Sequence, residues 1–417
     1  MKIFKILFYS IIALNIFQIQ LLFADDLQLP FHGFAEYGFA GRLSGNIYKS
    51  NDILMNEARG QFEFSKELTN ASMILKIDAL YDSVKKKSIV DIREANISLF
   101  PSQRWELKAG RQILTWGTGD LVFVNDLFPK DWNAFFIGRA DEYLKAPSDA
   151  LKLSVFYDFG TFNFIVSPQF TPDEYITGER MSYWGPGGMT GNIFNDSRPE
   201  SKLKNCEYHF RFSKNISGFE LALYSYKGFM KRPLGFDMNS GYGYFPRLAV
   251  HGFSGRMQAL GGILNLESGY YDSIDDRNGK NLMIENSMIK TVVGFEKEIA
   301  QNLTAAFQYF SEYMTQYSDY KLSAENMGQR PYKEKNHDWI TARLTNMRNQ
   351  ETLILSFFGY YSPAEEDWHL RPSVTYKMSD QVSLSAGLNV FGGKNYFTFF
   401  GQLEDNTNAY CRIKFAF

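Results

Sequence analysis

The chain has 417 residues and a formal net charge of −2 at pH 7. Its 44 Lys and Arg against 46 Asp and Glu give no basic excess of the kind that nucleic-acid-binding proteins carry, and its two cysteines are too few for a cysteine-based metal site. Aromatic residues make up 17% of the chain, although its mean hydropathy is slightly polar. A water-soluble protein would have to bury these rings, whereas a transmembrane β-barrel faces them to lipid around a wet interior.

The N-terminus has the pattern of a secretory signal peptide. Lys2 and Lys5 precede a mostly apolar run, residues 6–23, and Ala24 is followed by an acidic restart. A basic start, an apolar middle and a small residue at the cut define such a signal. We expect removal of residues 1–24 and a single exported domain at residues 25–417. A membrane anchor is the alternative, which the polar residues inside the run disfavour.

Alternation of polar and apolar residues recurs along the rest of the chain. The clearest segment, residues 57–65, places Glu, Arg and Gln side chains on one phase and small or apolar side chains on the other. Segments near 203–214, 302–316 and 381–392 repeat this pattern. A period of two is typical of strands with two different faces.

Short turn segments alternate with longer polar loops. The short turns are expected at residues 66–70, 101–104, 158–161, 213–218, 298–302, 347–350 and 379–381. Outer-membrane barrels combine short periplasmic turns with longer extracellular loops. We therefore predict an all-β fold, a transmembrane antiparallel β-barrel of about 18 strands with both termini periplasmic, and about 16 strands as the alternative. No turn signal divides residues 247–272, the weakest stretch of this prediction.

The C-terminus has the features of a closing strand. Tyr410, Ile413 and Phe415 precede the last residue, Phe417, and apolar residues alternate with Arg and Lys. This pattern resembles the last strand of bacterial outer-membrane β-barrels, in which it is the signal for the barrel-assembly machinery. The resemblance implies that these four residues form an assembly signal. It also implies residence in the outer membrane of a Gram-negative bacterium, in contact with outer-membrane lipid.

A second resemblance covers the region before the first long loop. The strand Arg93-Glu-Ala-Asn-Ile-Ser-Leu99 and the segment Trp105-Glu-Leu-Lys-Ala-Gly-Arg-Gln-Ile-Leu-Thr-Trp-Gly117 are followed by Asn125-Asp126 and Pro129-Lys-Asp131. This block resembles porin-like barrels of the alginate-export type and related uncharacterised outer-membrane barrels. The resemblance implies a porin-like architecture. Alginate itself is not implied, because the arginine-rich constriction of that family is matched here only by scattered arginines.

Two loops are long enough to suggest a function, residues 117–147 and residues 171–202. Charged, aromatic and glycine residues in the first suit a loop that folds into the lumen and narrows it, with a solvated surface loop as the alternative. For the second loop we favour the solvated surface. Acidic residues in the first loop could also bind Ca²⁺, but acidic loops are common, and we predict no metal and no cofactor.

Candidate pore residues are charged side chains of the first loop and of the strands. They are Arg59, Glu63, Glu94, Arg111, Asp120, Asp126, Asp131, Arg139, Arg343, Arg371 and Arg412. Arg111 and Asp126 are expected to position the loop, with Arg111 on the lipid-facing phase near the extracellular interface. Acidic N-terminal strands beside basic C-terminal strands could orient polar solutes. Alternatively, lumen charges such as Arg59 and Glu94 exist only to neutralise one another.

These patterns predict a porin-like outer-membrane channel for passive passage of small polar or anionic solutes or of a polymer. The alternative is a sealed barrel that acts as partner or scaffold in a multi-protein export or electron-transfer system, with a periplasmic protein partner. We expect no enzyme, because none of the five histidines lies in a recognisable nucleophile motif. We favour a monomer over a trimer.

Overall fold

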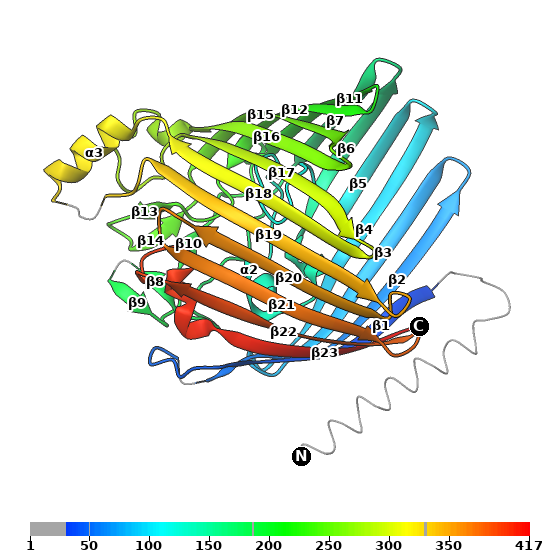
Figure 1. Ribbon diagram of the computed structural model, residues 1–417. Coiled ribbons are helices and arrows are strands. Elements are labelled where there is room, and N and C mark those ends of the chain that lie inside the picture. The colour runs from blue at the N-terminus through cyan, green and yellow to red at the C-terminus, as the bar shows by residue number, and fades with distance from the viewer. Residues whose placement is uncertain (1–30, 50, 186, 329–331) are drawn as a thin grey trace.

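The computed structural model describes residues 31–49, 51–185, 187–328 and 332–417. In this part of the chain, 18 strands form one antiparallel sheet, which the pairing of the first strand with the last closes into a barrel (Figure 1). The predicted all-β barrel of about 18 strands is confirmed, and the alternative of about 16 is wrong. The predicted signal peptide, residues 1–24, lies outside the described residues.

The barrel strands follow one another around the wall in chain order. They are β1 (Phe31–Arg42), β2 (Ile53–Leu68), β3 (Ala71–Asp82), β4 (Lys87–Ser102), β5 (Trp105–Ile113), β6 (Pro147–Tyr157), β7 (Gly160–Ser167), β11 (Glu207–Ile216), β12 (Phe219–Phe229), β15 (Arg247–Ala259), β16 (Gly262–Ser273), β17 (Met288–Ala300), β18 (Leu303–Met314), β19 (Asn336–Arg348), β20 (Leu353–Ser362), β21 (Asp367–Lys377), β22 (Val382–Gly393) and β23 (Asn408–Ala416).

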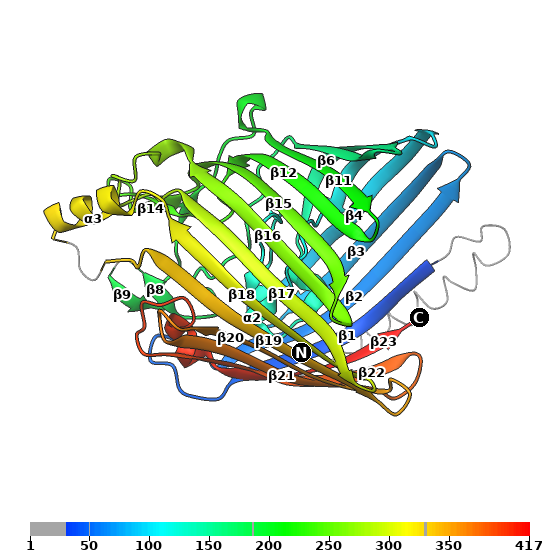
Figure 2. The same ribbon diagram turned by 45° about the horizontal axis from the view of Figure 1, so that its top comes forward.

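Smaller elements lie in the connections between the barrel strands. They are α2 (Trp132–Ile137), η1 (Asp141–Leu144), β8 (Tyr183–Gly185), β9 (Gly188–Thr190), β10 (Asp196–Ser197), η2 (Leu203–Asn205), β13 (Gly235–Asp237), β14 (Tyr242–Tyr244), η3 (Ile274–Asp276), α3 (Tyr317–Asn326) and η4 (Gly401–Asn406). Figure 2 shows α3, β8, β9 and β14 at the end opposite the C-terminus and α2 within the barrel. None of the helices in the described ranges is long and apolar enough to span a membrane.

The seven predicted short turns all join consecutive barrel strands, at the end of the barrel where the C-terminus lies (Figure 1). An eighth turn divides residues 247–272 at Leu260 and Gly261, with φ of 53° and 72°. Two left-handed residues in a row characterise the type I′ hairpin turn. Leu rarely adopts this conformation, so the sequence signal for a turn was weak. It consisted of the pair Gly261-Gly262.

The C-terminal strand has the two faces that its sequence predicts. Ile413 and Phe415 are exposed on the outside. On the inner face Arg412 donates a hydrogen bond to Glu36 of β1 at 3.1 Å. The ring of Phe417 stacks on Phe31 with centroids 5.6 Å apart. These outward rings are of the kind that forms the aromatic girdle of a membrane barrel.

A hydrophobic core lies inside the barrel, where a water-filled pore would carry only polar side chains. Two long loops and the inner wall build it. The first loop is residues 114–146, between β5 and β6, which we call the constriction loop; its Val124, Phe136 and Ile137 are at most 2% exposed. The inner wall supplies side chains such as Tyr360 of β20. Folding of the first long loop into the lumen is therefore correct, and the surface alternative for it is wrong.

The second loop, residues 168–206 between β7 and β11, departs from the prediction of a solvated surface. Arg180, Met181 and Ser182 are 6%, 0% and 0% exposed. Arg180 donates hydrogen bonds to the carbonyl oxygen of Leu54 at 2.6 Å and to the carboxylate of Asp82. The prediction failed because Leu54 and Asp82 lie more than 90 residues from Arg180 in the sequence, and only the closed barrel brings them to the loop.

Candidate channel constriction

A buried carboxylate on the barrel wall organises the start of the constriction loop. Glu267 of β16 accepts hydrogen bonds from the backbone N–H groups of Thr118 and Gly119, and from the side chain of Asn125 at 3.1 Å. Gly117 has φ of 87°, and a Cβ there would lie 2.9 Å from the Glu267 carboxylate. A glycine is thus required where the chain turns into the lumen.

The middle of this segment is tied to the opposite wall by Asp120. Its carboxylate accepts two hydrogen bonds from Arg343 of β19, at 2.5 and 2.8 Å. Gln308 of β18 clamps the Asp120 backbone from both sides, since it accepts from the N–H and donates to the C=O, each at 2.8 Å. Burial raises the pKa of Asp120, and Arg343 opposes part of that rise.

The far end of the constriction loop is held by Glu57 of β2. Arg139 donates two hydrogen bonds to Glu57, at 2.9 and 2.6 Å, and forms an ion pair with Asp131 at 3.4 Å. Arg180 of the second loop contacts the same Glu57 at 3.0 Å. One wall carboxylate therefore fixes both loops. Burial of charge at this density is tolerable only because opposite charges and hydrogen bonds compensate it.

Helix η1 adds a further set of tethers. Arg371 of β21 donates to Asp141 at 3.1 Å, and Lys414 lies 3.6 Å from Glu142. The guanidinium groups of Arg59 and Arg93 both lie over the ring of Tyr143, at 3.9 and 4.7 Å from its centroid. Cations over the face of a ring hold it by cation–π attraction. The loop is thus attached around most of the lumen.

The structure brings most of the predicted pore residues into this network, but it corrects the partner of Arg59. The expected pairing with Glu94 is wrong: Arg59 pairs with Asp78 at 2.5 Å. Glu94 and Glu63 instead share Lys76, at 3.6 and 2.9 Å. The expectation failed because β3 lies between β2 and β4, so that Arg59 is beside Leu80, whereas Glu63, Lys76 and Glu94 are in register across the three strands.

Arg111 lies apart from the lumen network. It is in register with Asp149 of β6, and its guanidinium lies 3.6 Å from Asp149 and 3.7 Å from Asp91. Asp149 is two residues from the exposed Leu151 and so shares its outward phase. The lipid-side placement of Arg111 that strand phase predicts agrees with the structure. Among the described residues, no side-chain hydrogen bond or ion pair links Arg111 to the constriction loop.

Some members of the network were not among the predicted residues. They are Glu57, Asp78, Asp82, Arg180, Glu267 and Gln308. Strand phase places Glu57 and Glu267 on the inner face, but it does not tell which inner carboxylates meet the loop. Arg180 had no sequence signal beyond its position in a long loop.

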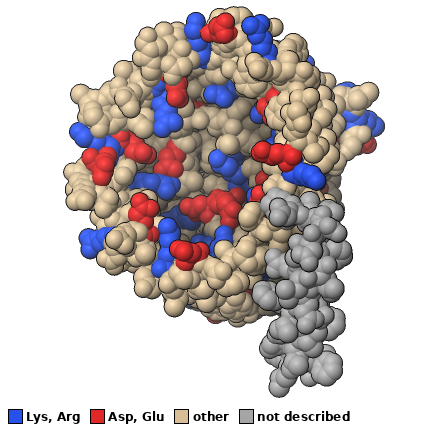
Figure 3. Space-filling model, turned by 90° about the vertical axis from the view of Figure 1, so that its right-hand side faces the viewer, with Lys and Arg blue, Asp and Glu red and all other residues tan. Residues whose placement is uncertain are grey.

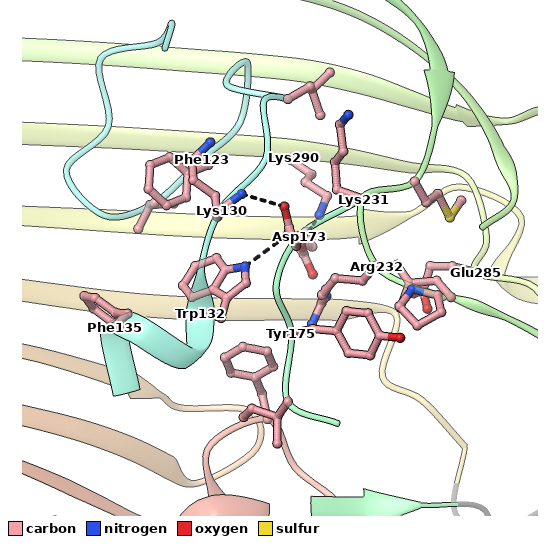
Figure 4. A pocket seen from close by; sticks show the side chains of 18 of the residues that line it. Phe123, Lys130, Trp132, Phe135, Asp173, Tyr175, Lys231, Arg232, Glu285 and Lys290 are labelled. Carbon is pink, nitrogen blue, oxygen red and sulfur yellow. Dashed lines mark hydrogen bonds and ion pairs between the residues drawn. The ribbon is translucent and has the colours of Figure 1, made fainter. Parts of the chain in front are cut away.

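Two cavities remain beside the constriction loop. One, of about 390 Å³, opens toward the loop end and is shown in Figure 4; the other is of about 230 Å³. Phe123 and Asp126 line both. Asp126 accepts hydrogen bonds from Lys130 at 2.9 Å and Thr115 at 2.8 Å, and the Lys130 ammonium lies over the Phe123 ring at 4.6 Å. The boundary shared by the two cavities therefore includes a ring and a neutralised carboxylate.

Several cations in the lumen have no ion-pair partner among the described residues. Lys108 and Lys152 lie directly opposite in the pairing of β5 with β6. For these two, and for Lys145 and Arg256 beside the smaller cavity, the described residues supply no ion pair. Glu296 also lines that cavity. Figure 3 shows charged side chains of both signs lining the hollow at the turn end.

No protein-family model matches the chain, and a search of curated proteins finds no match. Solved structures of other proteins share its architecture. OccD3 (OpdP) of Pseudomonas aeruginosa superposes with a TM-score of 0.54 at 10% identity, over 93% of this chain and 90% of that one. OccAB3 of Acinetobacter baumannii gives 0.54 at 9% identity, over 93% and 98%. At these identities the similarity shows the fold alone, which is that of outer-membrane porin-type β-barrels. The alginate-export resemblance stays a prediction.

Proposed function

We propose that this protein is an outer-membrane channel for passive passage of small polar solutes, with a preference for anions. The observation that carries the proposal is the position of the constriction loop. It crosses the lumen on tethers to β2, β16, β18, β19 and β21, yet it leaves two cavities that both border Phe123 and Asp126. A loop folded into a wide barrel narrows the passage and leaves space between the loop and the wall.

The orientation follows from the connections. The short turns and the described C-terminus share one end of the barrel, and the long loops share the other. In outer-membrane barrels short turns face the periplasm and long loops face the outside. We therefore assign the turn end to the periplasm. The predicted signal peptide would direct the export of the chain.

The preference for anions rests on the unbalanced cations. Lys108, Lys152 and Arg256 of the wall, and Lys145 at the end of the constriction loop, stand without ion-pair partners among the residues described, whereas the other charges of the constriction loop are largely neutralised. Fixed charge of one sign along a pore favours counter-ions. The cavities beside Phe123, of about 390 and 230 Å³, favour small solutes over a polymer.

The sealed barrel remains the second candidate, and one observation favours it. Val124, Phe136 and Phe400 form a dry core inside the lumen with exposures of 0–2%. A barrel filled in this way could serve as a partner or scaffold in a multi-protein system, in place of conducting.

Conductance of the refolded mature protein in a planar bilayer separates the two candidates. We expect steady single channels whose conductance rises when residues 120–143 are deleted, because the deletion removes the constriction. The matched control deletes residues 318–326 of α3, outside the lumen, and should conduct as the intact protein does. A correctly folded barrel that conducts in no form would overturn the channel and favour the sealed barrel.

A further inference from the structure

Aromatic residues are the most frequent kind lining the larger cavity, which opens toward the loop end. Trp132 and Phe123 of the constriction loop, Tyr175 of the second loop and Phe399 before η4 supply rings from three separate segments (Figure 4). Its volume of about 390 Å³ lies in the range of small-molecule sites. Rings that converge on one space favour a ligand with its own flat apolar face.

Most charged groups around this cavity already have a partner. Lys130 pairs with Asp126 at 2.9 Å, and Lys290 pairs with Glu312 at 2.5 Å. Lys231, which also lines the cavity, is neutralised by Glu207 at 2.7 Å.

The acidic groups on the other side are satisfied as well. Glu285 forms an ion pair with Lys333 at 2.9 Å. Asp173 accepts hydrogen bonds from the Trp132 indole N–H at 3.0 Å and from the Lys130 backbone N–H at 2.9 Å. A cationic ligand would therefore find no free carboxylate pair.

Arg232 is the exception. In the part of the chain that the structure describes, its guanidinium has neither a hydrogen bond nor an ion pair; it lies over the Phe399 ring, 5.5 Å from the centroid, and interacts with the charge of Asp173 only at longer range. Arg232 lines the same cavity, and Figure 4 shows it with Tyr175 and Glu285. A half-buried guanidinium with five free N–H donors presents a fork for a planar acid group.

We propose that this cavity binds a planar, ring-bearing organic anion. Its ring system lies among Trp132, Tyr175 and Phe399, and its carboxylate or sulfonate pairs with Arg232. The inference deepens the proposed function, because it names the class of solute that the channel would select, but the binding site itself does not depend on conduction. A neutral sugar fits less well, since the polar groups here are mostly engaged with one another.

Isothermal titration calorimetry on the refolded mature barrel in detergent micelles tests the site. The probe is 2-naphthoate; 2-naphthalenemethanol carries the same rings without charge, and octanoate carries the charge without rings. We expect 2-naphthoate to bind at least tenfold tighter than either. Arg232→Gln should lose about tenfold in affinity for 2-naphthoate and leave 2-naphthalenemethanol unchanged, whereas Phe399→Ala should weaken both ring compounds.

The matched control is Arg277→Gln, which removes an exposed guanidinium paired with Asp272 at the same end of the barrel. Titration into empty micelles corrects for partitioning, and the mobility of unheated samples in gel electrophoresis confirms that each variant is folded. Equal binding of the three probes, or an Arg232→Gln variant that binds 2-naphthoate like the intact protein, would overturn the inference. Binding without conductance would retain the site and reject the channel; conductance without binding would do the reverse.

Discussion

Asp120 and Arg343 join the constriction loop to the opposite wall through two hydrogen bonds, at 2.5 and 2.8 Å. They are 223 residues apart in the chain, and β18 supplies the neighbouring Gln308 clamp. The pair fixes how far the loop reaches across the lumen. Its geometry therefore bears on both the width of the passage and the charge beside it.

Loss of either partner should loosen the loop. We expect Asp120→Asn and Arg343→Gln each to raise open-channel noise and conductance, because the tether is removed while the fold stays closed. A double-mutant cycle on unfolding in urea should give a coupling energy of about 1 kcal/mol. Additive effects of the two substitutions would show that the ion pair is not an energetic tether.

Acidification should act through the same pair. Burial raises the pKa of Asp120, so its carboxylate takes up a proton at a higher pH than an ordinary aspartate. Protonation leaves Arg343 with an uncompensated charge, so anion selectivity should increase as the pH falls through that pKa. Reversal potentials in a KCl gradient measure this. Asp120→Asn should show the acid-state selectivity at neutral pH; an Asp120→Asn variant that still responds to pH like the intact protein would place the titrating group elsewhere.

Glu57 should matter more for stability than any surface carboxylate. Glu57→Gln removes the carboxylate that Arg139 and Arg180 share and leaves each with one acidic partner, Asp131 and Asp82, so the loss should approach the about 3–5 kcal/mol that breaking a buried ion pair costs. Urea unfolding in lipid vesicles measures the loss. Glu366→Gln, which breaks an exposed pair with Lys394, is the matched control and should leave stability unchanged. Equal stability of both variants would contradict the role of Glu57 as a shared anchor.

The unpaired lysines should set ion preference. Lys108→Glu together with Lys152→Glu places two carboxylates opposite each other on the lumen wall and should move the channel toward cations. Lys204→Glu, in an exposed loop position, makes a matched control for charge alone. The ratio of anion to cation permeability is the readout, and no change in that ratio would remove these lysines from the permeation path.

The strands and most turns could be predicted from sequence because alternation is local. Residues 57–65 show their inner face within nine positions, and β2 has the expected phase. The turn at Leu260 was missed because a left-handed Leu gives almost no sequence signal. Partner choice was beyond prediction for another reason: β3 lies between β2 and β4 and places Lys76 beside Glu94, and only the closed barrel brings Glu57 to Arg180.

The most direct test of the channel uses a single thiol at Phe123, which borders both cavities. Phe123→Cys is made in a background with Cys206→Ser and Cys411→Ser, and single channels are recorded during addition of a bulky, charged methanethiosulfonate reagent. The proposal predicts an open channel whose current drops in one irreversible step, because Phe123 borders both cavities. The matched Phe253→Cys variant, on the outer face, should react without loss of current. A folded Phe123→Cys barrel that carries no current, or a current untouched by the reagent, would contradict the proposal.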